Sequence, residues 1–450
     1  MEGLRPPASI ARPMSGAVSS AAAGAFDERV AARQARLGII GLGYAGLPLA
    51  MLFAEVGFDV TGIDLNESRV RAVGEGRSYL VDVPAERYQG VDGRLRASSD
   101  YAAVAELDAL TICVPTPLSK TRTPDISYIV SAAESVARHL REGQLIVLQS
   151  TSYPGTTEEI VLPILEESGG KVGQDFFLGY APERVDPGNK DWSIRNTPKL
   201  VAGVTEECRR RTETLYREIV DTVVPVSSPA VAETAKLHEN TFRAVNIALA
   251  NELALMCDRL GISVWEVIEA AKTKPFAFLA HYPGPGLGGD CIPVVPHFLA
   301  WRLREYGYSA QLIDAAHEVN AHMPVYVVQK ISDALNDVGK PIKGSRLLLL
   351  GMAYKSDVHD TRESPSLEVM RQLIGRGGEV RYCDPWVPDV ELDEVRHESA
   401  PWGPEAVAWA DCVVLLTPHR EFAEPAVWED AKLVVDTRNF TPPGPNVHSI

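Results

Sequence analysis

A glycine loop between two short apolar runs limits the possible folds of this chain more than any other feature. Residues 37–40 predict a buried strand, and GLGYAG follows directly at 41–46. Residues 47–57 then show a helical pattern that ends at a glycine, and residues 59–64 predict a second strand that ends on Asp64. A strand, a glycine loop, a helix and a strand ending on an acid form the fingerprint of a dinucleotide-binding fold.

Each residue of this fingerprint has an expected task with NAD. Gly41 would make the tight turn, Gly43 would let the backbone approach the pyrophosphate, and Gly46 would let helix and strand pack closely. Asp64 would accept hydrogen bonds from the adenosine ribose, which favours NAD over NADP. Tyr44 lies within the same loop and is a further candidate cofactor contact. The alternative is a plain glycine turn, which the complete strand and helix context disfavours.

The alternation of strands and helices continues along the chain. Further apolar strands are expected at 108–115, 144–149, 175–181 and 200–204, with helical stretches between several of them. A second α/β unit begins near residue 346 and has no glycine fingerprint. We therefore predict an α/β fold with two Rossmann-like doubly wound domains joined by a long central helix.

This pattern divides the chain into four parts. Residues 1–35 are rich in Ala, Ser, Pro, Gly and Arg, which predicts a disordered tail. Residues 36–228 would form the NAD-binding domain and residues 229–325 a central helical domain for dimerisation. Residues 326–450 would form a C-terminal Rossmann-like domain.

Charge and cysteine usage restrict the partners. The formal net charge of the 450 residues is −16, which argues against nucleic acid and anionic membranes as partners. The six cysteines form no CxxC pair, so we expect free thiols, a cytoplasmic location and no metal site.

Three short loops follow predicted strands and share one expected position. They are VPTP (114–117), STSYPGTT (150–157) and APERVDPGN (181–189). Ligands of doubly wound sheets sit beyond the carboxyl ends of the strands, so a common site at this edge is expected. Ordinary turn chemistry is the alternative.

Residues 231–260 contain no helix breaker and predict one helix of roughly 45 Å, longer than one small domain needs. It is a candidate bridge between domains and a candidate homodimer core. Lys236, Asn240 and Arg243 fall on one face of it. A solvated face would also explain them. The apolar stripe expected at the dimer comprises Val245, Leu249, Leu253 and Met256.

The stretch 282–293, YPGPGLGGDCIP, combines a flexible glycine loop with Cys291. Such a loop can offer free N–H groups to an anion, and a thiolate beside it suits nucleophilic catalysis. A turn followed by an inert, buried cysteine is the alternative.

Farther along, the segment 355–365, KSDVHDTRESP, places Lys355 and Arg362 just beyond a predicted strand. There they would either meet a phosphate or form an interdomain salt-bridge network.

With these motifs in order, residues 36–440 resemble the nucleotide-sugar 6-dehydrogenases, the family of UDP-glucose, UDP-N-acetylglucosamine and UDP-N-acetylmannosamine dehydrogenases. The resemblance is carried by GLGYAGLPLA, CVPTPL, STSYPGTT, PERVDPGN, AETAKLHENTFRAVNIALANEL, PGPGLGGDCIP and YKSDVHDTRESP. PERVDPGN and YPGPGLGG followed by CIP are most similar to the UDP-N-acetylglucosamine branch.

The resemblance implies a four-electron oxidation of the sugar C6 alcohol to a carboxylate, with one hydride passing to each of two NAD molecules. Cys291 would attack the intermediate aldehyde and carry the thiohemiacetal and then the thioester. Lys236 and Asn240 would stabilise the negative oxygen, and Lys236 would relay the first proton. Glu183 and Thr151 would position the hydrolytic water, with Glu183 as its candidate base.

The resemblance also implies that the C-terminal domain (326–450) is the nucleotide-sugar-binding domain, and it implies the ligand contacts. Thr116 and Arg362 would meet NAD. Lys355 and the loop 282–288, with Tyr282, Gly284 and Gly288, would meet the nucleotide sugar. Arg243 is a further candidate for the sugar or diphosphate, across a dimer interface.

Two positions depart from the family pattern. Val295 stands where members usually have an aspartate that holds the catalytic water, and Asp290 precedes the cysteine where a histidine or aromatic is common. An adjacent carboxylate pointing at the thiol would raise its pKa. Two alternatives therefore stay open: a nucleotide-sugar- and NAD-binding relative with impaired turnover, and a two-electron hydroxy-acid dehydrogenase, which would leave Cys291 without a task.

Overall fold

The computed structural model describes residues 20–80, 83–91, 93–119, 123–186, 188–189, 191–289 and 292–450. The described chain divides into two compact units, one ending at Lys236 and one beginning at Leu237, with Thr123 grouped with the second. The division falls within one helix, α8 (Pro229–Leu260), which confirms the predicted long helix. Within the described ranges, no helix is long and apolar enough to cross a membrane.

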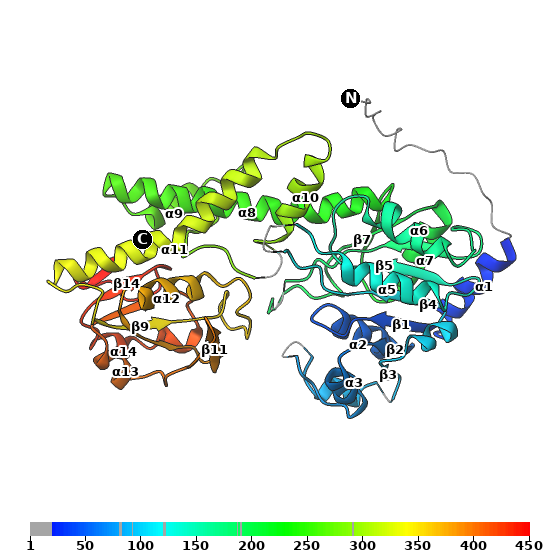
Figure 1. Ribbon diagram of the computed structural model, residues 1–450, viewed down its shortest axis with the longest axis horizontal. Helices are drawn as coiled ribbons and strands as arrows, with labels where there is room; N and C mark the ends of the chain where they lie inside the picture. The colour runs from blue at the N-terminus through cyan, green and yellow to red at the C-terminus, as the bar shows by residue number, and fades with distance from the viewer. Residues whose placement is uncertain are drawn as a thin grey trace. The chain divides into compact units, whose positions relative to one another are not determined.

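The first unit is built on an eight-stranded sheet in the order β3-β2-β1-β4-β5-β6-β7-β8 (Figure 1). Neighbouring strands are parallel except β6 and β7, which run antiparallel. The strands are β1 (Arg36–Ile40), β2 (Asp59–Ile63), β3 (Leu95–Ser98), β4 (Ala109–Ile112), β5 (Leu145–Leu148), β6 (Phe177–Tyr180), β7 (Lys199–Gly203) and β8 (Val223–Pro225).

Helices cover both faces of this sheet because its central strands are apolar on both faces. In β5, Leu145 and Val147 join one core, whereas Ile146 and Leu148 join the other. The helical segments of the unit are α1 (Ser20–Ala31), α2 (Gly46–Val56), α3 (Glu67–Gly74), α4 (Glu86–Gln89), α5 (Ser127–Ala137), α6 (Leu162–Glu166) and α7 (Glu206–Tyr216), with a 3₁₀ turn η1 (Tyr101–Glu106) and a π turn η2 (Thr156–Val161).

Helix α1 corrects the expectation that residues 1–35 form a disordered tail. Residues 1–19 lie outside the described residues, but Ser20–Ala31 are helical, and Phe26 and Val30 are buried in the core of the first unit. The Arg211 guanidinium stacks on the Phe26 ring at 5.2 Å, and Arg210 pairs with Asp27. Phe26 and Val30 are one helical turn apart, so together they give α1 an apolar stripe to bury.

The second unit repeats the α/β plan on a smaller sheet with a helical segment before it. Its five strands are all parallel, in the order β10-β9-β13-β14-β15. They are β9 (Arg346–Leu350), β10 (Glu379–Cys383), β13 (Cys412–Leu415), β14 (Val434–Asp436) and β15 (Val447–Ser449), and a separate antiparallel pair comprises β11 (Asp389–Leu392) and β12 (Val395–Glu398). The two sheets confirm the predicted pair of Rossmann-like units.

The second unit has two helices between the cysteine loop and β9, namely α10 and α11. Helix α11 runs along the sheet and contacts α12, β13 and β14 (Figure 1). After α8, the helical segments are α9 (Val264–Lys272), α10 (Val295–Arg304), α11 (Gln311–Asp337), α12 (Pro365–Gly375), α13 (Pro404–Trp409), η3 (Arg420–Ala423) and α14 (Pro425–Trp428).

Candidate functional site

The glycine loop after β1 has the geometry that its spacing predicts. Gly41 has a φ of +89°, and a Cβ there would lie 2.6 Å from the Cys113 carbonyl oxygen, so only glycine fits. A Cβ at Gly46 would clash with the Gly41 carbonyl oxygen. At Gly43 a Cβ would meet no described atom within 4 Å, which leaves the room that a pyrophosphate needs.

Asp64 lies at the end of β2 with its carboxylate beside this loop. Its Oδ2 accepts the backbone N–H of Leu42 at 2.7 Å, and its Oδ1 accepts that of Asn66 at 2.8 Å. Arg69 places Nη1 3.3 Å from Oδ2. A fixed carboxylate at this position fits the ribose of NAD, so the loop and the acid together suit the dinucleotide.

Tyr44 and Thr116 lie at the same edge of the sheet. Tyr44 is 49% exposed in the glycine loop, and Thr116 follows β4. Strands β1 and β4 are neighbours at the point where the strand order reverses. Ligands of doubly wound sheets bind at this reversal, so the predicted cofactor residues of the first unit share one edge.

Glu183, which follows β6, belongs to a cluster of charged and polar groups at this edge. Its Oε2 accepts the Lys199 ammonium at 3.1 Å and the Gln149 amide at 3.3 Å. Its Oε1 accepts the backbone N–H groups of Arg184 at 2.9 Å and Val185 at 3.0 Å. Burial alone would raise the pKa of Glu183, but the Lys199 ammonium and the two backbone N–H groups outweigh it, so this pKa lies below its ordinary value.

Sequence analysis missed Lys199 because the strand that carries it runs in the opposite direction. β7 is antiparallel to β6, so the start of β7 lies at the edge where β6 ends. Lys199 is the first residue of β7, and its side chain is only 3% exposed. Burial lowers the pKa of Lys199, and the Glu183 carboxylate opposes this shift. The sequence signal was a lysine directly before an apolar run.

The loop after β5 is fixed to the beginning of α8. Thr151 lies in this loop and is partly buried. Glu233, fully buried on α8, accepts hydrogen bonds from the backbone of Gly155 and from the backbone and hydroxyl of Thr157. Burial raises the pKa of Glu233 to about 7, against the opposing effect of these donors. Glu233 is a second residue that sequence analysis missed.

Lys236 and Asn240 lie one turn apart on α8, and each is 8% exposed. The Asn240 amide nitrogen has no hydrogen-bond partner among the described residues. No described residue forms an ion pair with Lys236 either. Arg243, expected on the same face, is exposed instead. The unpaired Asn240 amide nitrogen and the neighbouring Lys236 ammonium suit a ligand oxygen that carries negative charge.

Cys291 and Asp290 lie outside the described residues, but the preceding loop is firmly held within the second unit. The Gly284 N–H donates to the Asn251 side chain at 2.9 Å, and Asn251 donates to Asn320 of α11 at 2.8 Å. Tyr282 is 38% exposed and donates to Glu269 at 2.6 Å. Asn251 stands in the motif AETAKLHENTFRAVNIALANEL, but sequence analysis gave it no role, and Asn320 stands in no quoted motif.

This loop passes so close to two other segments that glycine is required. A Cβ at Gly288 would lie 2.5 Å from the Cβ of Tyr354, and one at Gly284 would clash with the Arg438 guanidinium. Arg438 follows β14, and burial lowers its pKa to about 10. Sequence analysis missed this cation, whose only signal was its place just after an apolar run.

Lys355 and Arg362 lie in the segment between β9 and α12, beside the same loop. The Gly289 N–H donates to the Arg362 carbonyl oxygen at 2.9 Å. The Arg362 guanidinium pairs with Asp360 through two short hydrogen bonds and is 43% exposed. Within the second unit, the structure therefore brings together the predicted residues Gly284, Gly288 and Arg362, with Lys355 on the adjoining turn.

A cavity of about 440 Å³ lies in the second unit behind this loop. Thr241 of α8, Leu287 and Pro293 of the loop, His297 of α10 and Glu363 contribute to its wall. The cavity is thus lined by residues of the cysteine loop and of helices α8, α10 and α11.

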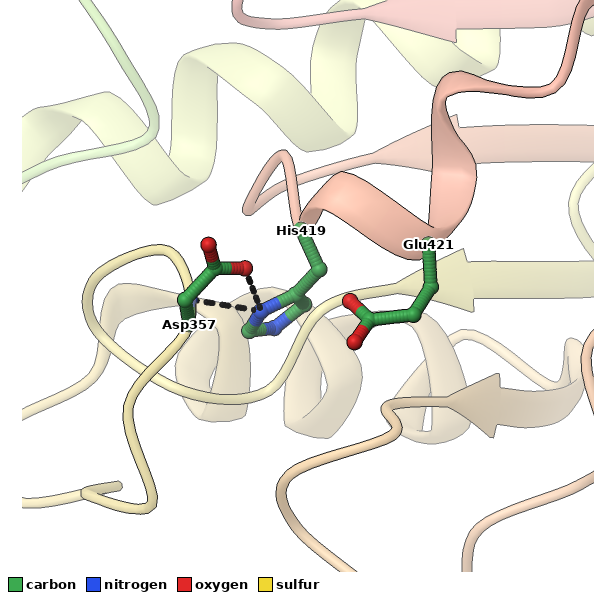
Figure 2. Close-up of side chains that lie close together, drawn as sticks. All are labelled: Asp357, His419 and Glu421. Atoms are coloured by element: carbon green, nitrogen blue, oxygen red, sulfur yellow. Dashed lines mark hydrogen bonds and ion pairs between the residues drawn. The ribbon is translucent and has the colours of Figure 1, made fainter.

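Asp357, His419 and Glu421 come close together in the second unit and resemble a metal-ligand set (Figure 2). Both ring nitrogens of His419 are already used, however. Nδ1 accepts the Asp357 backbone N–H at 2.9 Å, so Nε2 carries the proton that it donates to Asp384 at 3.1 Å. His419 therefore has no free lone pair for a cation, and it fixes the turn that carries Lys355.

Asp384 lies at the end of β10, as Asp64 lies at the end of β2. It is 2% exposed and accepts the N–H groups of Met352 and Ala353 in addition to His419. The corresponding acid of the second sheet is thus bonded to His419, whereas Asp64 has Arg69 as its side-chain partner.

Known proteins match the chain along most of its length. It matches the UDP-glucose/GDP-mannose dehydrogenase family in three successive parts: the NAD binding domain over residues 35–220, the central domain over 230–322 and the UDP binding domain over 348–443. It is 35% identical over 397 residues to UDP-N-acetyl-D-glucosamine 6-dehydrogenase of Pseudomonas aeruginosa, covering 86% of this chain and 91% of that protein.

Two matches point to one further relative. The chain is 34% identical to UDP-N-acetyl-D-mannosamine dehydrogenase of Pyrococcus horikoshii, over 90% of this chain and 96% of that protein. The solved structure of UDP-D-ManNAc dehydrogenase from the same organism aligns with a TM-score of 0.85 at 33% identity, covering 92% of this chain and 99% of that chain. The protein is thus an NAD-dependent oxidoreductase, and it belongs to the UDP-glucose/GDP-mannose dehydrogenase family.

Proposed function

We propose that this enzyme oxidises the C6 hydroxyl of a UDP-N-acetylhexosamine to the carboxylate. Four-electron oxidation of a nucleotide sugar with NAD fits the family to which the chain belongs. The N-acetylhexosamine is inferred from the names of its relatives, which act on UDP-N-acetyl-D-glucosamine and UDP-N-acetyl-D-mannosamine. NAD, when bound, accepts the hydride.

The buried pair Lys236 and Asn240 is the observation that carries this proposal. The Asn240 amide nitrogen lacks a hydrogen-bond partner among the described residues, and each of the two residues is only 8% exposed. Leaving the buried amide unpaired costs about 1–3 kcal/mol unless a ligand completes it. An alkoxide or a tetrahedral oxyanion at C6 would do so, and Lys236 would take the proton of the alcohol in the first oxidation.

The second oxidation is assigned to Cys291. Its sulfur would bond to the aldehyde carbon, and the thiohemiacetal would lose the second hydride to give a thioester. Glu183 and Thr151, which follow neighbouring strands β6 and β5, would then position the water that releases the acid. In this scheme Cys291 acts in the second oxidation, and Glu183 and Thr151 act in the hydrolysis of the thioester.

The proposed ligand contacts divide into those for NAD and those for the nucleotide sugar. Gly41, Gly43, Gly46, Asp64 and Thr116 would hold NAD, together with Tyr44 and, from the second unit, Arg362. Tyr282, Gly284, Gly288 and Lys355 would hold the nucleotide sugar. Arg438 joins this group, because its partly buried guanidinium beside Gly284 is suited to a diphosphate. Exposed Arg243 would act from a partner subunit.

The decisive experiment is the yield of NADH per nucleotide sugar over a panel of UDP- and TDP-hexoses. We expect two NADH per molecule, and the highest kcat/KM with a UDP-N-acetylhexosamine. Intact-protein mass spectrometry of a quenched reaction should show a sugar adduct on the native protein and none on Cys291→Ser. Full turnover by Cys291→Ser at the native rate would refute the covalent route.

One observation favours a binding relative with impaired turnover. Val295, which stands in place of the family aspartate, is 3% exposed at the start of α10, so this position supplies no group that can hold a water. The same panel tests this alternative, because it predicts tight binding of both ligands with less than one NADH per sugar.

We also propose a homodimer formed through α8. Phe242, Leu249 and Met256 are spaced by seven residues and are 46%, 62% and 48% exposed. Of the stripe expected from sequence, Leu249 and Met256 are exposed, whereas Val245 and Leu253 are partly buried. An exposed apolar stripe on a long helix is a typical self-association surface.

We also propose a cytoplasmic location. The five cysteines among the described residues are free thiols, which is typical of a reducing compartment.

A further inference from the structure

Lys199 is the centre of a closed hydrogen-bonded cluster at the carboxyl edge of the first sheet. Its ammonium donates to the Glu183 carboxylate at 3.1 Å and to the Gln149 amide oxygen at 3.2 Å. The Tyr216 hydroxyl donates to the same amide oxygen at 3.0 Å, and its ring lies 5.3 Å from the ammonium. Three elements that pack against it, namely α7 and the loops after β5 and β6, therefore fix the direction of the Lys199 side chain.

Lys199 and Glu183 compensate each other's charge. The lysine side chain is 3% exposed and the glutamate side chain 20% exposed, and Glu183 is the one carboxylate paired with Lys199 among the described residues. Cys113 is close by, but burial raises the pKa of its thiol to about 12, so it stays neutral. The like charge of Lys236 acts on Lys199 as well and lowers its pKa further. Removing one partner of such a pair leaves a buried, uncompensated charge.

The remaining contacts aim the carboxylate. Backbone N–H groups of Arg184 and Val185 occupy Oε1 at 2.9 and 3.0 Å. Oε2 faces Lys199 and, at 3.3 Å, Gln149, which is the longest of the four contacts. Each oxygen thus has two donors, and the two contacts of Oε2 are longer than those of Oε1.

We propose that Lys199 is a positioning residue for the hydrolytic step, because it holds Glu183 as an ionised carboxylate with Oε2 directed at the water. This inference rests on the proposed role of Glu183. In that step the water oxygen bonds to the thioester carbonyl carbon, and the carbon–sulfur bond breaks with its electron pair passing to the Cys291 sulfur. One water proton passes to Glu183, and the other remains on the new carboxyl group.

The test is the pH dependence of thioester hydrolysis, measured as decay of the Cys291 adduct by intact-protein mass spectrometry over roughly pH 5 to 9. Lys199→Met removes the ammonium, so protonation of Glu183 should become easier. The fall in hydrolysis rate at low pH should therefore shift to higher pH by about 1–3 units. Lys199→Arg keeps a cation and should keep the native pH dependence. Lys171→Met, at an exposed lysine of the same unit, is the matched control and should behave as native protein.

Different variants test the role of Lys199 and the role of Glu183. A Lys199→Met protein that is slower by the same factor at every pH would overturn the inference, because a merely structural lysine gives that result. Native-rate hydrolysis by Glu183→Gln would instead overturn the proposed role of Glu183. If Lys199→Met does not fold, the double variant Glu183→Gln/Lys199→Met removes both charges. It should hydrolyse at the rate of Glu183→Gln alone, and a further tenfold loss would contradict the inference.

Discussion

The backbone N–H of Gly155 donates a hydrogen bond to the Glu233 carboxylate at 2.7 Å. Thr157 adds its N–H at 3.0 Å and its hydroxyl at 2.6 Å to the other carboxylate oxygen. The loop that carries Thr151 is thereby fixed to the first turns of α8, three residues before Lys236. One buried acid thus positions two parts of the proposed site.

Glu233 should make the stability of the enzyme depend on pH. Its pKa is raised from 4.5 to about 7, chiefly by burial, so between these values the folded protein binds this proton more tightly than the unfolded chain. Stability from this group is therefore present below pH 4.5 and is lost as the pH rises to about 7. The loss amounts to about 3 kcal/mol.

Glu233→Gln should flatten this dependence. The thermal midpoint of native protein should fall between pH 5 and pH 8 by roughly several degrees more than that of the variant. Glu252→Gln, at an exposed glutamate of the same helix, is the control and should keep the native slope. Parallel slopes for native protein and Glu233→Gln would contradict the assignment.

Asn240→Ala should separate catalysis from stability. Because the Asn240 amide nitrogen has no partner among the described residues, its removal should leave the thermal midpoint nearly unchanged. The loss of one oxyanion donor should lower kcat by roughly 10²–10³-fold. Asn246→Ala on the same helix removes an amide that bonds only to the helix backbone, and it should keep native kcat. Equal losses in the two variants would argue against the oxyanion role.

Asp64→Asn should weaken the preference for NAD. The variant removes the negative charge that repels a 2′-phosphate but keeps an oxygen for the Leu42 N–H. Arg69, now 3.3 Å from the carboxylate, would then be available to the phosphate. We expect kcat/KM with NADP to rise by roughly tenfold or more. Asp64→Asn/Arg69→Gln should lose that gain, and its persistence would exclude Arg69 as the phosphate contact.

Val295→Asp should change stability and hydrolysis in opposite directions. Burying a carboxylate at a position that is 3% exposed should lower the thermal midpoint, although the first turn of α10 partly favours an acid. A water-holding group beside the cysteine loop should speed thioester hydrolysis. Val295→Asn matches the polarity without the charge. Acceleration by both variants would show that the carboxylate charge is not required.

Leu249→Glu tests the proposed dimer. Leu249 is 62% exposed at the middle of α8, so the substitution should leave the fold intact. In a dimer formed through this helix it would bury two like charges, which should shift light-scattering mass from dimer toward monomer at micromolar concentration. Leu312→Glu, at a 75% exposed leucine of α11, is the comparison. A native protein that is already monomeric would end the proposal.

Sequence reasoning was strongest where function depends on local geometry. The glycine loop and Asp64 could be predicted because a φ of +89° at Gly41 and the end of a strand are encoded within a few residues. The long helix could be predicted because no breaker interrupts it. The predicted position of Cys291 is not tested, since that residue lies outside the described ranges.

The missed residues depend on long-range pairing. Lys199 reaches Glu183 only because β7 runs antiparallel to β6, and the direction of a strand cannot be read from its apolar pattern. Asn251 holds Gly284 across 33 positions in the chain. Such contacts are set by tertiary structure rather than by local propensity.

The burial of Arg211 makes the segment before the first strand an integral part of the enzyme. Its guanidinium stacks on Phe177 at 3.5 Å on one side and on Phe26 of α1 at 5.2 Å on the other. A recombinant protein shortened to begin at Arg36 would uncover this cation and the apolar surface under Val30. A recombinant protein that keeps this packing therefore has to begin before Phe26, even though the dinucleotide fingerprint begins only at β1.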